Sequence, residues 1–197
     1  MTLRPDLAII AANVASGTRV LDIGCGDGAL MAELRDRKQV DARGIEIDPL
    51  NVSLAVTRGL SVIQGDADTD LSYYPDDTFD YAILSQTLQT TRAPDRVLHE
   101  LLRIGRRAFV SFPNFAYWRV RWSLMWSGHM PVTAALPVSW YETENIHQLT
   151  VNDFRAFVAE HGVVVENAWF LSGGSAKRIG PINANWRAEH AVFLLRR

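Results

Sequence analysis

The sequence has a single cysteine among its 197 residues. Cys25 therefore has no partner in this chain for a disulfide bond, which is typical of proteins from a reducing compartment. Long apolar runs are also missing, and none approaches the ~18 residues that a membrane-spanning helix needs. We therefore expect a cytoplasmic protein that has no membrane segment and no disulfide bond.

An excess of charge of one sign is missing too, because 20 lysines and arginines face 22 aspartates and glutamates, and the net charge is −2. A surface devoted to nucleic acid needs an excess of positive charge. Histidine is sparse, and the five histidines are scattered without the spacing of metal ligands: His99, His129, His147, His161 and His190. We therefore expect neither a nucleic-acid partner nor a metal site.

What the chain does contain is ordinary for a globular domain, with 48% hydrophobic and 21% charged residues. Its length suits one domain with a substantial core, so we expect a single domain over residues 1–197. Near the start, Leu7, Ile10 and Val14 fall on one helical face. Polar residues interrupt this apolar stretch, which favours a short helix packed on the sheet over a signal peptide.

Short apolar runs alternate with helical patterns along most of the chain. The runs predict seven strands: Arg19–Ile23, Ala42–Ile47, Leu60–Gln64, Phe79–Leu84, Ala108–Phe112, Val163–Leu171 and Ala188–Leu195. Between them, helices are predicted over Ala29–Arg37, Asp48–Arg58, Ala93–Arg103 and Thr150–His161. This alternation indicates an α/β fold with a doubly wound, mostly parallel, seven-stranded sheet. A connection that holds Gly173, Gly174 and Gly180 separates the last two strands.

Two of these helices carry recognisable starting signals. Asp48 is placed to cap a helix that has Pro49 in its first position. Thr150 and Asp153 have the spacing of a capping box, in which each side chain bonds the other residue's backbone amide. Both signals predict the first residue of a helix to within a position or two.

A glycine-rich turn follows the first predicted strand, in the order Asp22-Ile-Gly24-Cys-Gly26-Asp-Gly28. Glycine adopts backbone angles that are closed to other residues, and it presents no Cβ to a ligand lying on the turn. The first amides of the next helix point into the same crevice. The pattern predicts a nucleotide-type site at the carboxyl end of a parallel strand. The alternative is a tight turn that binds nothing.

The charges of the turn help to choose the ligand. Gly24, Gly26 and Ala29 also match the dinucleotide fingerprint G-x-G-x-x-G/A, but Asp22 and Asp27 would repel a pyrophosphate. S-adenosylmethionine (SAM) carries a sulfonium and an ammonium and has no phosphate, so it suits an acidic turn. The turn resembles motif I of the class I SAM-dependent methyltransferases. That resemblance implies the sheet type of that class and contacts to SAM or S-adenosylhomocysteine (SAH) from Asp22, Gly24, Cys25, Gly26, Asp27 and Gly28.

Glu46 lies near the end of the second predicted strand, about 20 residues after the glycine turn. An acid at this position can accept hydrogen bonds from both ribose hydroxyls of a nucleotide. Its neighbours Ile45 and Ile47 are apolar, so an unliganded Glu46 would hold an unpaired charge near the core. We therefore expect Glu46 and Ile47 to contact the cofactor. The alternative is a solvated carboxylate at a strand end.

Two further strand ends complete the expected site. Asp66 and Ala67 resemble the methyltransferase segment in which an acid accepts from the adenine amino group and the backbone reads the ring edge. The alternative for Asp66 is an ordinary turn, because an acid after a strand is also a common turn residue. Ser85 and Gln86 end the fourth strand, at the position that lines the sulfonium side of the cofactor in that class. Ordinary loop polarity explains these two residues as well.

The methyl acceptor leaves no signature in the sequence. No Asn/Asp-Pro-Pro-aromatic tetrad follows the fourth strand, and no Pro-Cys pair is present. Methyl transfer is an in-line displacement whose catalysis comes largely from positioning, and a base is needed only where the acceptor must lose a proton. No base that faces the methyl group is identifiable.

Residues 114–147 break the strand–helix alternation and form an insert after the fifth predicted strand. Trp118, Trp122 and Trp126 recur every four residues and so share one side of a helix, with Arg119 and Arg121 beside them. Stacked bases, an anionic membrane surface or a protein interface would each suit this composition. We favour a protein interface, or a lid helix that buries its tryptophans on its own domain, over nucleic acid.

The motifs of the insert also indicate which methyltransferase-like family the sequence resembles. The sequence resembles the MetW family of methionine-biosynthesis proteins, which are methyltransferase-like, over about Leu3 to Val158. The matching stretches are Val20–Gly28, Arg37–Val40, Gly44–Pro49, Gln86–Gln89, Phe112–Phe115, Trp118–Trp122, Gly128–Val132 and Trp140–His147. The glycine turn belongs to methyltransferases in general, whereas the insert motifs are unusual and carry the resemblance.

The resemblance implies association with homoserine O-acyltransferase, the enzyme that activates homoserine for methionine synthesis. Two functions follow from it. The chain is either an accessory subunit that binds SAM or SAH and docks on the acyltransferase, or an active SAM-dependent methyltransferase with an unidentified small-molecule or protein acceptor. We favour the accessory role, and a dehydrogenase is a distant third.

Overall fold

The computed structural model describes residues 3–133, 136–172 and 177–197, so Gly173 and Gly174 of the last connection lie outside the described residues. The strands are β1 (Arg19–Ile23), β2 (Asp41–Glu46), β3 (Ser61–Gln64), β4 (Phe79–Ser85), β5 (Gly105–Pro113), β6 (Val164–Ser172), β7 (Lys177–Arg178) and β8 (His190–Arg196). The helices are α1 (Pro5–Asn13), α2 (Ala29–Lys38), α3 (Pro49–Thr57), α4 (Pro94–Ile104), α5 (Trp118–Ser127), α6 (Val151–Glu160) and α7 (Ala184–Arg187). Three short 3₁₀ turns are η1 (Leu71–Tyr73), η2 (Leu88–Thr90) and η3 (Pro181–Asn183).

The strands form one sheet in the order β3-β2-β1-β4-β5-β8-β6-β7. The first five strands in this order are parallel, and β8 runs antiparallel to both β5 and β6. All seven predicted strands are therefore present, and the two-residue β7 extends the edge beyond β6. The doubly wound, mostly parallel arrangement that the sequence predicts is confirmed.

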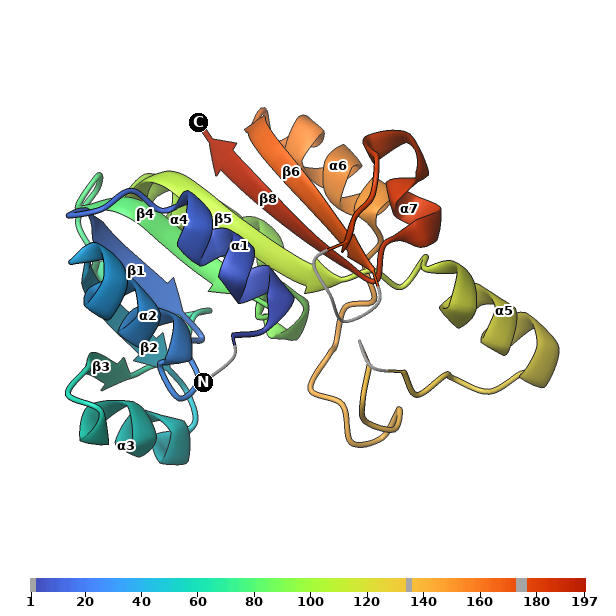
Figure 1. Cartoon of the computed structure of the whole chain (residues 1–197), viewed down its shortest axis with the longest axis horizontal. Coiled ribbons are helices and arrows are strands. Elements are labelled where there is room, and N and C mark those ends of the chain that lie inside the picture. The colour runs from blue at the N-terminus through green and yellow to red at the C-terminus, as the bar shows by residue number, and fades with distance from the viewer. Residues whose placement is uncertain (1–2, 134–135, 173–176) are drawn as a thin grey trace.

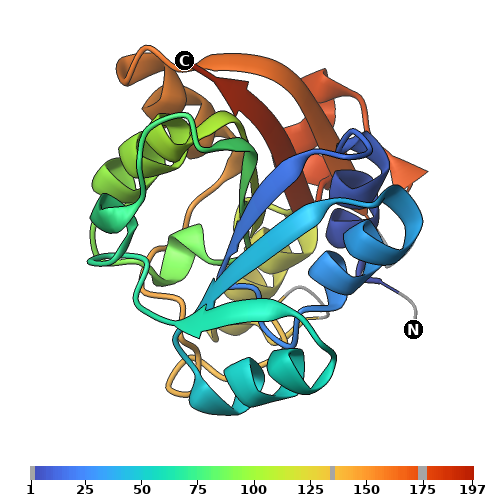
Figure 2. The ribbon, with the colours of Figure 1, turned by 90° about the vertical axis from the view of Figure 1, so that its left-hand side faces the viewer.

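Helices cover both faces of the sheet, as Figure 2 shows with α1 and α2 on one side of the strands and α4 and α6 on the other. Alternate residues of each buried strand serve the two cores. Leu21 and Val110 pack with α4 and α6, whereas Val20 and Phe109 pack with α1 and α2. The parallel strands are thus buried on both faces, which explains why they read as nearly continuous apolar runs.

The predicted starting signals are confirmed. The Asp48 carboxylate accepts from the Leu50 amide at the start of α3. Thr150 and Asp153 form the reciprocal capping box that begins α6. Within the described ranges, no helix is both long and apolar enough to cross a membrane.

The insert stands apart from this framework. Helix α5 projects at the end of the molecule opposite α3, and the chain that follows it loops back toward the sheet (Figure 1). One side of α5 is covered, where Tyr117, Val120 and Leu136 form a small buried cluster. The opposite side is open, and Trp126 is 75% exposed. The interpretation of α5 as a lid that buries its tryptophans is therefore wrong.

Candidate cofactor site

The glycine turn joins β1 to α2 at the carboxyl ends of the parallel strands. Gly24, Gly26 and Gly28 have φ angles of 71°, 56° and 76°, a region that other residues rarely adopt. A Cβ on Gly24 would lie 2.3 Å from Oγ1 of Thr87. The amide of Gly24 donates to the Ile45 carbonyl at 2.8 Å, which binds the turn to β2. Backbone geometry and close packing both require glycine here.

Glu46 holds the turn from the other side. Its carboxylate is buried, and it accepts hydrogen bonds from the Gly26 amide at 2.7 Å and from the Asp48 amide at 2.9 Å. The two backbone amides compensate part of the cost of burying the charge. Glu46 thus fastens the glycine turn to the start of α3. Whether it also takes the ribose hydroxyls remains a prediction.

Asp22 lies at the end of β1 and is 2% exposed. Burial raises its pKa to about 7, Arg4 opposes the shift, and Glu46 adds to it. Among the described residues, no hydrogen bond reaches the Asp22 carboxylate. A buried acid with so little compensation is a typical mark of a functional site, because a cationic ligand can supply the missing partner.

The remaining two side chains of the turn have structural tasks. Cys25 packs with Met31, Ala55 and Leu60, and burial, together with Asp22, raises the pKa of its thiol far above the ordinary range. It is a packing residue and no nucleophile. Asp27 accepts from the Ala29 amide at 3.1 Å just before α2, and it forms an ion pair with Arg58 at 2.9 Å. The cation-attracting charge of the site therefore resides in Asp22 and Glu46, whereas the charge of Asp27 is compensated.

A cavity of about 250 Å³ opens beside the turn. It brings together four of the predicted residues: Gly24, Ile47, Asp66 and Ala67. Ile23 and Ile45 add apolar wall, and the polar lining includes residues that sequence reasoning missed: Asp68, Thr87, Thr90, Thr91, Arg92 and Glu144. An apolar slot with acidic groups at one side suits an adenine ring and its amino group.

The acids after β3 differ in how much acceptor capacity remains. One oxygen of Asp66 accepts from the Asp68 amide at 2.9 Å, and the other has no hydrogen bond among the described residues. Both oxygens of Asp68 accept from the Arg92 amide, at 3.1 and 2.9 Å, and the first also accepts from Ala93. Asp66 therefore keeps more acceptor capacity than Asp68, and its contact with an adenine amino group stays a prediction.

Ser85 and Gln86 belong to an internal network at the ends of β4 and β5. The Ser85 hydroxyl donates to the buried carboxylate of Asp6 at 3.0 Å, and the Ser111 hydroxyl donates to the same oxygen at 2.9 Å. Gln86 has a φ of 54° and lies 3.4 Å from both Asp6 and Nδ1 of His190. Burial lowers the pKa of His190. The segment before and within α1 thus occupies the strand ends where we expect the sulfonium side.

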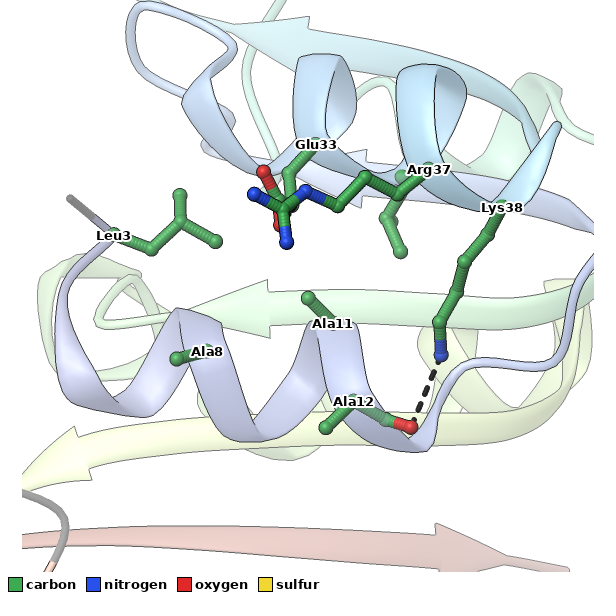
Figure 3. Close-up of a pocket in the computed structure, with 8 residues that line it drawn as sticks. Leu3, Ala8, Ala11, Ala12, Glu33, Arg37 and Lys38 are labelled. Atoms are coloured by element: carbon green, nitrogen blue, oxygen red, sulfur yellow. Dashed lines mark hydrogen bonds and ion pairs between the residues drawn. The ribbon is translucent and has the colours of Figure 1, made fainter. Parts of the chain in front are cut away.

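A second cavity of about 530 Å³ lies between α1 and α2. Figure 3 shows alanines of α1 facing the charged side chains of α2 across it. Glu33 and Arg37 pair at 3.0 Å, and Lys38 donates to the Ala12 carbonyl at 3.0 Å. These charged groups are engaged with one another or with the backbone, and they lie away from the glycine turn. The cavity beside the turn is therefore the candidate site.

Known proteins share this framework. The solved S-adenosylmethionine dependent methyltransferase from Mesorhizobium loti superposes with a TM-score of 0.70 over 98% of this chain and 98% of that one, at 17% identity. That likeness covers almost the whole domain and so concerns its fold. The fold is therefore that of the class I SAM-dependent methyltransferases, as the glycine turn indicates.

Two relatives are closer in sequence. The bifunctional methionine biosynthesis protein MetXA/MetW of Rhodopirellula baltica is 34% identical over 207 aligned positions, which include all of this chain and 33% of the relative. The magnesium-protoporphyrin O-methyltransferase of Rhodobacter capsulatus is 32% identical over 116 positions, 55% of this chain and 51% of the relative. This chain thus spans a third of the first relative and about half of the second. The model of the methionine biosynthesis protein MetW matches residues 4–195, and the chain belongs to the MetW family.

Proposed function

We propose that this chain is an accessory subunit of methionine biosynthesis that binds SAM or SAH and associates with homoserine O-acyltransferase. The cavity beside the glycine turn is the proposed cofactor site. The exposed face of α5 is the proposed docking surface, defined by Trp118, Trp122, Met125 and Trp126. Each part rests on a different observation.

The residues around the turn fit SAM or SAH. Gly24 and Gly28 have no room for a Cβ, since one on Gly28 would lie 2.3 Å from Cδ1 of Leu60. Asp22 and Glu46 supply negative charge for the ammonium of either ligand and the sulfonium of SAM. Asp66 has an oxygen that can accept from the adenine amino group, and the isoleucines of the cavity cover the ring. When bound, SAM would supply an electrophilic methyl group, and the chain's part is to orient it.

The relative from Rhodopirellula carries the partner assignment. It joins a MetXA unit and a MetW unit in one chain, and this protein corresponds to a third of its length. The presence of both units in one chain of the relative favours a physical association between them. The exposed tryptophans of α5 support this proposal, because interface anchors are disproportionately Trp and Arg.

The alternative is an active methyltransferase, and its support is the likeness to the magnesium-protoporphyrin O-methyltransferase. Ser85 argues against it, because the hydroxyl is engaged with Asp6. Gln86 lies within 3.4 Å of the same carboxylate. An acceptor entering beside these two residues would first have to displace the start of α1. The accessory role needs no acceptor beside Ser85 and Gln86.

The first test is the choice of cofactor. We expect SAM and SAH to bind at least ~10-fold more tightly than NAD, because Asp22 and Glu46 repel a pyrophosphate on the turn. Isothermal titration of the three ligands under one buffer condition measures this. Tighter binding of NAD would contradict the proposed site.

The second prediction concerns the ribose. We expect Glu46 to bond the ribose hydroxyls, so wild-type protein should prefer SAH over its 2′-deoxy analogue by ~1–3 kcal/mol. In Glu46→Ala the glycine turn also loses its anchor, and both ligands should bind weakly and equally. Titration of both ligands to both proteins separates the two effects. A preference that survives in Glu46→Ala would transfer the ribose contact to Asp48.

The third prediction follows from the raised pKa of Asp22, about 7 in the folded chain against 3.8 for an ordinary aspartate. The folded state holds the proton more tightly, so the free energy of unfolding falls as pH rises from about 4 to about 7. Asp22→Asn removes the buried charge and should raise the Tm of the ligand-free protein at about pH 8 by ~4 °C or more, with little change near pH 4.

The same variant should weaken SAM binding at about pH 8, because the cation loses its carboxylate. Wild-type affinity for SAM should rise between about pH 6 and pH 8, and the affinity of Asp22→Asn should stay level. Thermal melts and titrations at these pH values check both statements. An identical Tm for the two proteins at about pH 8 would refute the buried-charge argument.

The fourth prediction concerns docking. Trp122 is 52% exposed and stacks on Trp126 with ring centroids 5.0 Å apart. Trp122→Ala should leave the Tm almost unchanged and weaken binding to homoserine O-acyltransferase by ~2–4 kcal/mol, about 30-fold or more. Tyr73→Ala is the control, since Tyr73 is an exposed aromatic outside the insert. Normal binding by Trp122→Ala would remove α5 from the interface.

A further inference from the structure

The cofactor cavity has a wall that comes from the insert. Glu144 lines the cavity together with Thr90, Thr91 and Arg92. Residues 143–147, here called the strap, are held there by two hydrogen bonds. The amides of Ile146 and His147 both donate to the Gln89 carbonyl, at 2.9 and 3.0 Å.

Gln89 connects the strap to the end of β4. Its side-chain Nε2 donates to the Gln86 carbonyl at 2.7 Å, and its backbone carbonyl receives the strap. The buried residue Gln89 therefore links the strap to Gln86, which lies at the strand end where we expect the sulfonium side of the cofactor.

The contact between Gln89 and the strap leaves two polar atoms without hydrogen-bond partners. Oε1 of Gln89 and Nε2 of His147 are buried and have no hydrogen-bond partner among the described residues. Buried polar atoms without partners are uncommon and costly. A small displacement of the strap that gives these two atoms partners would lower the free energy of the protein. A ligand in the adjoining cavity can favour or oppose that displacement.

The other end of the same segment reaches α5. The amides of Glu142 and Thr143 donate to the Ser139 carbonyl at 3.1 Å each, which forms a compact turn before the strap. Further back, Leu136 is buried against Tyr117 and Val120 at the base of α5. The insert thus touches the cofactor cavity at one end and carries the exposed tryptophans at the other.

We propose that the strap couples cofactor binding to acyltransferase binding, so that occupancy of the cavity changes the affinity of the α5 face for its partner. This inference rests on the proposed function and adds its regulation. Coupling between two sites is reciprocal, so each ligand must change the affinity of the other by the same factor.

The test uses the full chain, SAH and homoserine O-acyltransferase. The Kd of SAH is measured with and without saturating acyltransferase, and the Kd of the acyltransferase is measured with and without saturating SAH. We expect a change of ~5-fold or more, equal in both directions. Two measurable affinities that do not influence each other would overturn the coupling and leave the proposed function standing. Failure of either ligand to bind would overturn the proposed function and the coupling with it.

A pair of variants at one position tests the strap itself. Ile146→Pro removes the amide that donates to Gln89, whereas Ile146→Ala keeps this amide and removes an exposed side chain. We expect Ile146→Pro to bind SAH and the acyltransferase separately with a coupling factor near one, and Ile146→Ala to keep the wild-type factor. Wild-type coupling in a folded Ile146→Pro protein would exclude the strap as the connection.

Discussion

The buried carboxylate of Glu46 is the contact on which the candidate site depends. It binds the Gly26 amide and the Asp48 amide, and so joins the glycine turn after β1 to the start of α3. Its charge also raises the pKa of Asp22, which is already buried. The site therefore concentrates negative charge that is only partly compensated within the chain. Such an arrangement reduces the stability of the free protein and favours a cationic ligand, a trade-off common at binding sites.

The strand ends beside Ser85, where we expect the sulfonium side of the cofactor, are organised differently. There Asp6 accepts from Ser85 and Ser111, and Arg4 donates to Ser85 at 3.0 Å. A carboxylate with several donors is well compensated, so this side gains little from an added ligand. The negative charge of Asp22 and Glu46 is only partly compensated, whereas that of Asp6 beside Ser85 is well compensated. This contrast is the physical reason for which we propose an accessory role rather than catalysis.

Much of the fold follows from local sequence signals. Apolar runs located the seven longer strands, and Asp48 and Thr150 located two helix starts, because periodicity and capping depend on residues a few positions apart. The glycine turn was predictable for the same reason. The Asp27–Arg58 pair and the Asp6–Ser111 bond join residues 31 and 105 positions apart, and no local pattern reports such contacts. Glu144 was missed similarly, since only the tertiary path of the insert brings it to the cavity.

The stability of the domain does not explain the composition of the insert. A tryptophan contributes to folding by leaving water, yet Trp122 and Trp126 are 52% and 75% exposed and stack mainly on each other. In the described part of the chain, the buried cluster at α5 consists of Tyr117, Val120 and Leu136, with Phe115 packed against it, and contains no tryptophan. The exposed face therefore adds apolar surface without adding core, which in a folded protein is typical of a surface that another molecule covers. The same segment also forms a wall of the candidate cavity through Glu144, and this shared position is the structural basis of the coupling that we propose between the α5 face and the strand ends.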